Sequence, residues 1–584
     1  MDGETMTSEW NTPVLELKNL TTEFVTKRGA FRAVDDVSLE LHAGKTLCVV
    51  GESGSGKSVM SRSILQIVDP PGRVAGGQAL LHRHRTARAG AGEETVDLLK
   101  LNPKSRAIRS LRGRDVAMIF QEPMSSLSPV HRIGDQVGEA IRLHEPVSKK
   151  DARERTFELL RKVEIPNPGK AIDQFPFEFS GGMRQRAMIA MALACNPTVL
   201  IADEPTTALD VTIQAEILDL IRSIQDDSDM AVLFITHDMG VVAEIADEIA
   251  VMRFGKVVET GDVYDIFERP QHYYTQRLLN SVRELDHPSE RRLAMRKERP
   301  VGAPCLVSDN VRKVFGGSKS WFGTEVEGLV AVNDAELELR SGENLGIVGE
   351  SGSGKTTLGR CLQRVHDVTA GRILYTDSSG LERDLAPLTE NQLEQPWRDI
   401  RTVFQDPFSS LNPRMTIGQI IAEPLVVEGK LTGPQIRERV YELLELVGLP
   451  VSAYMRYPHA FSGGQRQRVS IARAIAPNPR IIIADEATSA LDVSLRTQIL
   501  DLLLDLQERL DLSFILISHD IAVIRYFCDR IAVMYRGRIV ETGDTETVCN
   551  TPQHEYTQSL LSAVPVADPR ARGQKQRVRY REAI

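Results

Sequence analysis

The sequence is poor in cysteine, in aromatic residues and in long apolar runs. Its six cysteines stand singly, without a CxxC pair or a His-rich stretch, so the sequence predicts neither a disulfide framework nor a cysteine metal site. Its most apolar stretches have about the length of a strand, far short of the roughly 18 residues that a membrane helix needs. We therefore expect a protein of a reducing compartment that crosses no membrane by itself.

The sequence also lacks a secretory signal and an excess of positive charge. The N-terminal run MDGETMTSEWNTP is polar and acidic, unlike the basic start and apolar core of a signal peptide. A formal net charge of −9 argues against a protein that coats nucleic acid by charge alone. At 584 residues the chain is too long for one hydrophobic core, so two or more domains are expected.

One motif occurs twice, as GESGSGKS from position 51 and as GESGSGKT from position 349. Both copies fit the phosphate loop G-x-x-x-x-G-K-[ST], in which backbone N–H groups surround phosphate, the lysine neutralises its charge and the last hydroxyl reaches Mg²⁺. Each copy follows an apolar strand and precedes a helical stretch, expected over 59–68 and 357–365. The predicted ATP-binding loop residues are Gly51, Glu52, Ser53, Gly54, Ser55, Gly56, Lys57, Ser58, Gly349, Glu350, Ser351, Gly352, Ser353, Gly354, Lys355, Thr356 and Thr357.

The second half of the chain repeats the first in order. Corresponding positions are 298 apart at the loop lysines, 284 apart at the glutamines of QEP and QDP, and 282 apart from the FSGG motifs onward. The first half has 14 extra residues before its glutamine, which we place in the polar run 82–94 as a surface excursion. The second half has seven extra residues around 316–328. Apolar strands alternate with helical stretches in both halves, which predicts parallel α/β units.

Two acidic pairs and two histidines follow buried strands at matching positions. Asp203 and Asp485 end apolar strands, where a carboxylate can hold the hydration shell of Mg²⁺. The next residues can orient or deprotonate an attacking water, and a neutral imidazole after the following strand can contact the γ-phosphate. The predicted catalytic residues are Glu204, Glu486, His237 and His519.

A phosphate loop alone is shared by kinases, GTPases, helicases and transport ATPases, so the neighbouring motifs decide. Each half contains, in order, the loop, Q-[ED]-P, F-S-G-G-x-R-Q-R, a strand ending in Asp-Glu, A-L-D and [TS]-H-D. This set resembles the nucleotide-binding domain of ABC ATPases, twice over nearly the whole chain. The resemblance implies an α/β fold of two tandem P-loop NTPase domains, each with a RecA-like core, an antiparallel β subdomain and a helical signature subdomain.

The resemblance also implies how the two halves share nucleotide. Each FSGG signature would complete the ATP site of the other half, in an intramolecular head-to-tail sandwich of the two domains. The signature residues added to the ATP sites are Ser180, Gly181, Gly182, Ser462, Gly463 and Gly464. The residues expected to hold Mg²⁺ are Ser58, Gln121, Asp203, Thr356, Gln405 and Asp485. The expected ligands are thus ATP and Mg²⁺, with hydrolysis at both sites.

The sequence predicts five segments. They are a first nucleotide-binding domain (13–264), its C-terminal extension (265–284), a charged linker (285–304), a second nucleotide-binding domain (305–546), and a second extension with a basic tail (547–584). Two positions near the predicted sites differ between the halves: Val59 matches Thr357 and lacks its hydroxyl, and Met183 matches Gln465 and lacks its amide. We therefore expect a modest asymmetry in nucleotide affinity. Five aromatic residues are candidates to stack on adenine, and a place in the hydrophobic core is the alternative for each. They are Phe24, Phe31, Phe315, Trp321 and Phe322.

The repeated element P-Q-H-x-Y-T-x-x-L-L after each domain resembles the extension of peptide-importer ATPases, and the whole chain is most similar to the glutathione-importer branch. This implies an ATP-hydrolysing motor for glutathione, dipeptide or oligopeptide import, with no iron–sulfur cluster. Its partners would be two transmembrane permeases and, indirectly, a periplasmic binding protein, with no nucleic acid, at the cytoplasmic face of a bacterial inner membrane. A soluble tandem ABC ATPase of translation or repair is the alternative, and opine or nickel the alternative cargo. The basic tail 570–581 lies either on anionic lipid or free in solvent.

Overall fold

The computed structural model describes residues 13–27, 29–84, 93–121, 126–206, 209–286, 301–316, 328–404, 410–489, 491–574, 576–578 and 580. These residues form two compact units. The first unit comprises Met1–Leu209, Ile213–Leu279 and Pro565–Lys575, and the second comprises Asp210–Thr212, Asn280–Val564 and Gln576–Ile584. Each unit is described by itself below.

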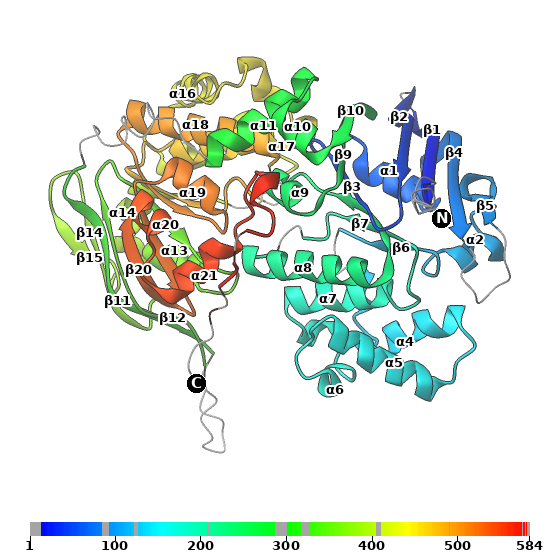
Figure 1. Cartoon of the computed structure of the whole chain (residues 1–584). Coiled ribbons are helices and arrows are strands. Elements are labelled where there is room, and N and C mark those ends of the chain that lie inside the picture. Colours follow the sequence, from blue (N-terminus) through cyan, green and yellow to red (C-terminus); the bar gives the residue numbers. More distant parts are fainter. Residues whose placement is uncertain are drawn as a thin grey trace. The chain divides into compact units, whose positions relative to one another are not determined.

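The first unit combines two sheets with helices (Figure 1). Its strands are β1 (Leu15–Thr26), β2 (Gly29–Leu41), β3 (Thr46–Val50), β4 (Gly72–His84), β5 (Glu93–Asp97), β6 (Val116–Ile119), β7 (Val199–Asp203), β8 (Ala231–Ile235), β9 (Glu248–Arg253) and β10 (Lys256–Asp262). Its helices are α1 (Lys57–Ile64), α2 (Arg106–Leu111), α4 (Ile133–His144), α5 (Lys149–Lys162), α6 (Pro168–Ala171), α7 (Gly181–Ala192), α9 (Met239–Ile245) and α10 (Val263–Glu268), together with α8 (Val211–Ser228) from Ile213 onward and α11 (Tyr273–Asp286) as far as Leu279.

The larger sheet of this unit has the order β10-β9-β3-β8-β7-β6, parallel except for β10 at its edge. Strands β3, β7 and β8 are buried along their whole length, as expected for a sheet covered on both faces. The smaller sheet, β2-β1-β4-β5, is antiparallel. In Figure 1 the helices α4, α5 and α6 gather beneath α7, away from the smaller sheet.

The second unit repeats this architecture. Its strands are β11 (Pro304–Phe315), β12 (Leu329–Arg340), β13 (Asn344–Val348), β14 (Ala370–Thr376), β15 (Glu382–Asp384), β16 (Ile400–Val403), β17 (Ile481–Asp485), β18 (Ser513–Ile517), β19 (Arg530–Tyr535) and β20 (Arg538–Asp544). Its helices are α13 (Lys355–Leu362), α14 (Glu394–Asp399), α15 (Ile417–Glu428), α16 (Gly433–Leu446), α17 (Gly463–Ile475), α18 (Val493–Leu510), α19 (Ile521–Phe527), α20 (Thr545–Asn550) and α21 (Glu555–Ala563).

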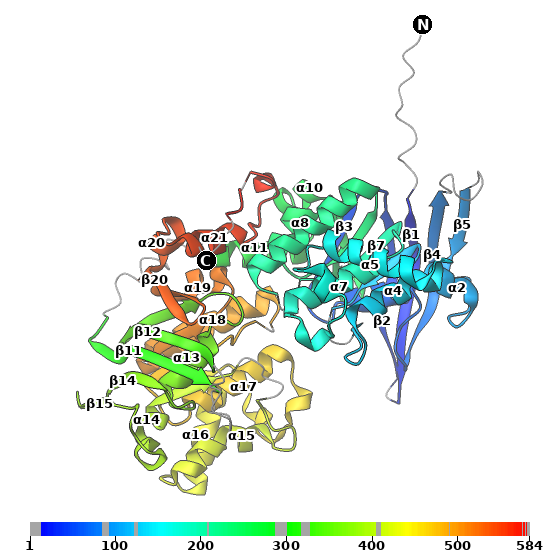
Figure 2. The same cartoon turned by 90° about the horizontal axis from the view of Figure 1, so that it is seen from below.

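Its sheets have the orders β16-β17-β18-β13-β19-β20 and β12-β11-β14-β15. Figure 2 shows α15, α16 and α17 grouped together, on the other side of α13 from the strands β11 and β12. The predicted fold class is therefore confirmed: each half has a mostly parallel core sheet, an antiparallel β subdomain and a helical subdomain that contains the FSGG segment.

The helices after the phosphate loops are shorter than predicted. They begin at Lys57 and Lys355 and end at Ile64 and Leu362, instead of continuing to 68 and 365. The cause is local: just past each end, Gln66 and its counterpart Arg364 adopt φ values of 51° and 58°, in the left-handed region. The chain therefore leaves the helix at this point in both halves.

The inserted residues of the two halves lie in different places. His82 and Arg83, expected in a surface excursion, belong to β4, which pairs with β5 in a long hairpin. The rest of that insertion, 85–92, and most of the second insertion, 317–327, lie outside the described residues.

The linker was expected to start at residue 285. The helix α11 instead continues to Asp286, with Leu285 buried.

The C-terminal segment Pro565–Lys575 belongs to the first unit although it ends the chain. Arg570 forms an ion pair with Glu268 at 2.6 Å, and Arg572 donates to the carbonyl of Ala246 at 3.1 Å. Further along, Val578 donates its N–H to the hydroxyl of Ser562 within the second unit. The described part of the basic tail thus packs on protein, which contradicts the expectation of a tail free in solvent.

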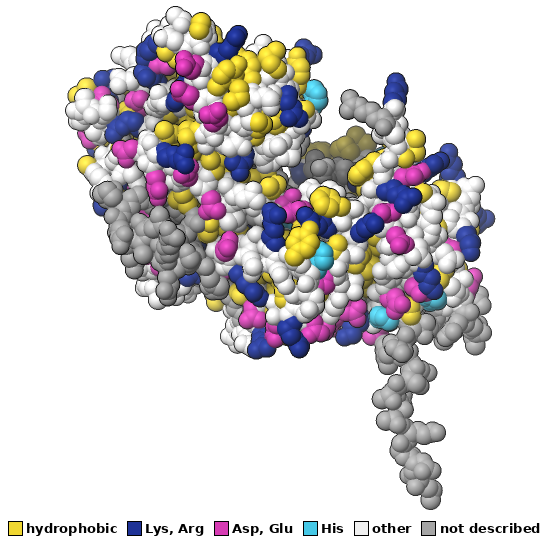
Figure 3. Space-filling model, turned by 90° about the horizontal axis from the view of Figure 1, so that it is seen from above, with side chains coloured by type: hydrophobic (Ala, Val, Ile, Leu, Met, Phe, Trp, Pro, Cys, Tyr) yellow, Lys and Arg dark blue, Asp and Glu magenta, His cyan; other side chains and the backbone are white. Residues whose placement is uncertain are grey.

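Basic and acidic side chains are interspersed over the face in Figure 3, rather than gathered by sign. Among the described residues no helix is both long and apolar enough to cross a membrane.

Candidate nucleotide-binding sites

The glycine that opens each phosphate loop is required by its surroundings. Gly51 and Gly349 have φ values of 152° and 153°. A Cβ added at either would lie 2.2 Å and 2.1 Å from the carbonyl oxygens of Met252 and Met534, which is a steric clash with backbone. The loop therefore passes directly against the neighbouring strand, and only glycine fits there.

The loop lysine is held by the loop itself. The Nζ of Lys57 donates to the carbonyls of Gly51 at 2.7 Å and Glu52 at 3.0 Å. Lys355 makes the same two bonds, at 2.7 Å and 2.8 Å. Burial lowers the pKa of Lys355, although the carboxylates nearby act in the opposite direction. Both ammonium groups are thus positioned at the start of the helix, where a phosphate would lie.

A hydroxyl and a carboxylate meet at the end of each central strand. Ser58 Oγ donates to Asp203 at 2.9 Å, and Thr356 Oγ1 donates to Asp485 at 3.0 Å. Burial raises the pKa of both carboxyl groups, because the charged form is poorly solvated at these positions. Paired oxygen ligands of this kind suit Mg²⁺.

The predicted catalytic glutamates occupy a strained backbone conformation. Glu204 and Glu486 have φ values of 48° and 47°, in the left-handed region that costs a non-glycine residue about 1 kcal/mol or more. Their N–H groups donate to Ile235 and Ile517 on the adjacent strands, at 3.0 Å and 2.9 Å. These bonds to the sheet therefore hold the strained backbone, and the strained backbone sets the direction of each glutamate side chain.

The glutamate, the histidine and the glutamine of the Q-E-P motif converge in the first unit; the segments around Gln121 and Gln405 are called the Q-loops below. Glu204 accepts from Gln121 Nε2 at 2.9 Å and lies 3.3 Å from His237 Nδ1. In the second unit His519 Nδ1 lies 3.1 Å from Glu486, and this hydrogen bond raises the pKa of the histidine. Gln405 lies outside the described residues.

The signature serines begin the helices that follow them. Ser180 Oγ accepts from the N–H of Met183 at 3.3 Å, and Ser462 Oγ accepts from Gln465 at 3.4 Å. Only the second helix has a reciprocal bond, from the Ser462 N–H to the Gln465 amide at 3.2 Å. Methionine at 183 cannot accept that bond. The role of both signatures toward the other half remains a prediction.

The aromatic candidates for adenine are placed unevenly. Phe31 is 64% exposed and lies opposite half-buried Phe24 in the β1–β2 pair. Phe315 packs edge-on against His366 with ring centroids 5.4 Å apart. Trp321 and Phe322 lie outside the described residues. These contacts leave the choice of the adenine residue open.

Sequence reasoning missed two tyrosines at the phosphate loops. Tyr274 and Tyr556, the tyrosines of the repeated P-Q-H-x-Y-T element, accept the N–H of Glu52 at 2.9 Å and of Glu350 at 3.1 Å. Each tyrosine is only 2% exposed. Their repetition at one position of a shared motif was the available signal, but it does not reveal which residue they contact.

The second unit also includes Asp210, from the first A-L-D motif. Its carboxylate accepts the N–H of Ser351 in the second phosphate loop at 2.5 Å. Thr212 donates to the Glu350 carboxylate at 2.8 Å.

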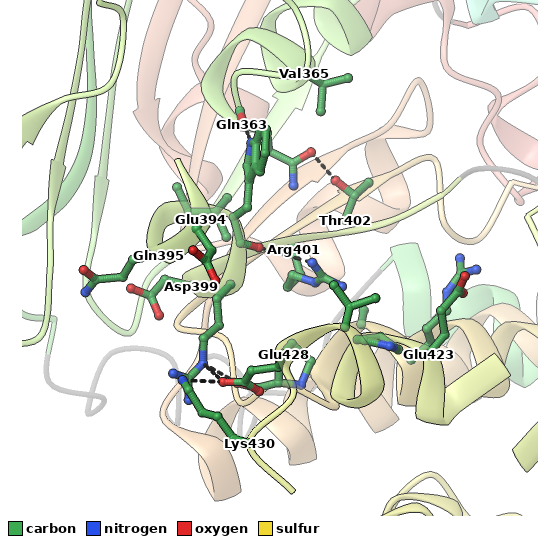
Figure 4. A pocket seen from close by; sticks show the side chains of 18 of the residues that line it. Gln363, Val365, Glu394, Gln395, Asp399, Arg401, Thr402, Glu423, Glu428 and Lys430 are labelled. Carbon is green, nitrogen blue, oxygen red and sulfur yellow. Dashed lines mark hydrogen bonds and ion pairs between the residues drawn. The ribbon is translucent and has the colours of Figure 1, made fainter. Parts of the chain in front are cut away.

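A groove of about 1080 Å³ lies in the second unit beside the strand that leads to Gln405 (Figure 4). Arg401 projects from β16 toward the helix α15, which carries Glu423 and Glu428. Glu428 pairs with Arg398 at 3.0 Å, and Arg473 of α17 completes the lining. Burial lowers the pKa of the Arg401 and Arg473 guanidinium groups.

Two family profiles, several relatives and a solved structure match parts or nearly all of the chain. A family profile described as ABC transporter matches residues 34–207 and 332–489, and one described as the oligopeptide/dipeptide transporter C-terminal region matches 258–304 and 540–583. The chain is 46% identical to glutathione import ATP-binding proteins of Escherichia coli O157:H7 and of strain K12, over 97% of this chain and 91% of each relative. It is 31% identical to a solved dimeric ATP-binding cassette bound to ADP and phosphate, over 41% of this chain and 98% of that one, with a TM-score of 0.36.

Proposed function

The chain belongs to the ABC transporter ATP-binding proteins, and we propose that it hydrolyses ATP at two sites to drive peptide import through separate permease subunits. The relatives' names make glutathione the first cargo to test, followed by dipeptides and oligopeptides. The observation that carries the proposal is that each unit brings together a loop lysine, a hydroxyl–aspartate pair and a glutamate–histidine pair.

These groups have complementary tasks in hydrolysis. Lys57 and Lys355 donate to phosphate oxygens from the end of the loop, where the helix N-terminus adds backbone donors. Glu204 and Glu486 orient the attacking water and receive its proton. His237 and His519 fix the direction of these carboxylates, and Gln121 does the same from the Q-loop.

The hydroxyl–aspartate pairs are suited to Mg²⁺. Ser58 with Asp203, and Thr356 with Asp485, place two oxygen ligands together at a buried position where negative charge is costly. When bound, Mg²⁺ neutralises charge on the β- and γ-phosphates. Gln121 and Gln405 remain proposed additional ligands.

We place each ATP between one phosphate loop and the signature of the other half. One feature supports this arrangement. The N-termini of α7 and α17, which begin directly after Ser180 and Ser462, offer backbone N–H groups to an anion. ATP then closes the two halves because it binds the closed state more tightly.

The groove of the second unit is the proposed contact for one permease. It lies next to the Q-loop, so closure around ATP moves its walls, β16 and α15. Exposed Phe404 and Val427 on its lining provide apolar surface for a partner. Such docking would hold the chain at the cytoplasmic face of the inner membrane without a membrane helix of its own.

Co-purification tests the importer against its alternative. We expect two small membrane permeases to co-isolate with the tagged chain in detergent, whereas co-sedimentation with ribosomes or DNA would favour a role in translation or repair. Uptake of labelled glutathione, dipeptides, opines and nickel in a deletion strain, with and without the restored chain, then identifies the cargo.

A further inference from the structure

One peptide unit in each phosphate loop has hydrogen bonds at both ends. Its carbonyl, from Gly51, accepts from Lys57 Nζ at 2.7 Å, and its N–H, from Glu52, donates to the Tyr274 hydroxyl at 2.9 Å. In the second unit the same peptide joins Lys355 to Tyr556, at 2.7 Å and 3.1 Å. Bonds that share one peptide group polarise and orient each other. Each tyrosine is thus linked to the phosphate-loop lysine through a single rigid peptide plane.

The C-terminal extension is built to place this tyrosine. In the first unit Glu259 accepts the N–H groups of Gln271 and His272, at 2.6 Å and 3.1 Å. His272 Nδ1 then accepts the N–H of Tyr274 at 3.2 Å, at the start of α11.

The second extension repeats these bonds at equivalent residues. Glu541 accepts from Gln553 and His554, at 2.8 Å and 3.0 Å, and His554 accepts from Tyr556 at 3.1 Å. In each unit the end of one strand, β10 or β20, and the P-Q-H-x-Y-T element therefore form one hydrogen-bonded structure that places a buried tyrosine.

The surroundings of the tyrosine differ between the units. The Arg253 guanidinium lies 4.8 Å from the ring centroid of Tyr274. In the second unit Tyr535 lies 4.3 Å from Tyr556, and Tyr580 of the tail lies 5.8 Å from Tyr556 and 5.4 Å from Tyr535. The end of the chain thus contributes to the packing of the second tyrosine within that unit.

We propose that Tyr274 and Tyr556 are positioning residues that orient the phosphate-loop lysines, so that each C-terminal extension acts on ATP affinity. In the second unit the tail, through Tyr580, adjusts the same site. This inference rests on the proposed ATP sites, and it assigns a task to the C-terminal extension. Because the hydroxyl orients the lysine without touching the reacting atoms, its loss affects ATP binding more than the hydrolysis step.

Equilibrium binding of a fluorescent ATP analogue with Mg²⁺ tests the second site in a full-length Lys57→Ala background. Tyr556→Phe removes the hydroxyl and keeps the ring, so we expect Kd to rise about fivefold, the effect of losing one ordinary hydrogen bond. The kcat at saturating ATP, measured in the otherwise unmodified chain, should change by less than about twofold. Tyr580→Ala should raise Kd by about twofold at this site.

Tyr526→Phe is the matched control, because its buried hydroxyl donates to Asp501 at 2.7 Å, as part of α19 and not of the extension. We expect it to lower the melting temperature and leave Kd unchanged. Tyr274→Phe in a Lys355→Ala background should reproduce the Tyr556→Phe result, with no response to Tyr580→Ala. An unchanged Kd for Tyr556→Phe, or an equal rise for Tyr526→Phe, would overturn the proposal. Binding is measured without turnover or permeases, so a failure of the transport function would be seen separately.

Discussion

The two units hold the same proposed catalytic groups, but the residues that pack behind these groups differ. The hydroxyl–aspartate distances are 2.9 Å and 3.0 Å, and the glutamate–histidine distances are 3.3 Å and 3.1 Å. Behind the loops, an arginine packs on the tyrosine in the first unit and two further tyrosines do so in the second. Duplication has therefore preserved the geometry at the phosphate and allowed the packing around it to diverge.

The two units differ more in the residues beside the Q-loops than in those behind the phosphate loops. Arg401 and Arg473 line the groove of the second unit, and the repeat places Ala117 and Met191 at the matching positions of the first. Among the described residues neither arginine has a carboxylate within ion-pair distance. A partner of the second unit can therefore gain from a carboxylate, whereas the matching positions of the first unit carry no charge, with Ala117 buried and Met191 half-buried.

The equivalence of the two proposed catalytic sites can be tested by removing one proposed base at a time. Glu204→Gln and Glu486→Gln each keep the side-chain shape and remove the proton acceptor, so each should lower turnover at its own site by about 10²–10⁴-fold. ATP hydrolysis by the purified chain, with Mg²⁺ and after its removal by EDTA, measures the effect. Equal losses would confirm two equivalent sites; undiminished hydrolysis in the double variant would contradict the assigned bases.

The groove comparison can be sharpened by giving the second unit the residues of the first. Arg401→Ala with Arg473→Met should weaken binding to the detergent-solubilised permeases by about tenfold or more, because a partner carboxylate would lose its counter-charge. Titration of the immobilised chain with permease measures this. Arg509→Ala, at an exposed ion pair with Asp505 on α18, is the control. An equal loss in the control would show that overall charge matters and that the groove does not.

The smallest expected effect concerns the signature helices. Met183→Gln gives the first helix the reciprocal cap of the second and should stabilise its unit by about 0.5 kcal/mol. Gln465→Met should destabilise the second unit by a similar amount. Thermal unfolding followed by circular dichroism compares the pair; shifts of the same sign in both variants would contradict the capping explanation.

The sequence predicted the fold because its signals are local, and the proposed reacting groups carry signals of the same kind. A phosphate loop combines strand, glycines, lysine and hydroxyl within a few residues, and the acidic pair lies at the end of a recognisable apolar strand. The pairings of Ser58 with Asp203 and of Gln121 with Glu204 follow once the strands are assembled in one sheet. The order of motifs in each half then indicated the ABC architecture.

Other features depend on contacts that no local pattern encodes. Tyr274 reaches Glu52 across 222 positions of sequence, and the motif that contains it would also fit an ordinary amphipathic helix. The left-handed φ of Gln66 and of Glu204 is imposed by neighbouring strands and turns, because neither residue favours it intrinsically. The basic composition of the tail suggested solvent or lipid, whereas Arg570 and Arg572 contact the first unit, and Val578 and Tyr580 contact the second.

That packing affects how the protein is made. Pro565–Lys575 belongs to the first unit, yet it is synthesised after almost the whole second half. Domains are generally expected to fold in turn from the N-terminus during synthesis. The first unit, however, is complete only after Pro565–Lys575 has been synthesised. A gene split at the linker would likewise encode a first half without its last segment, with Glu268 and the carbonyl of Ala246 left without Arg570 and Arg572.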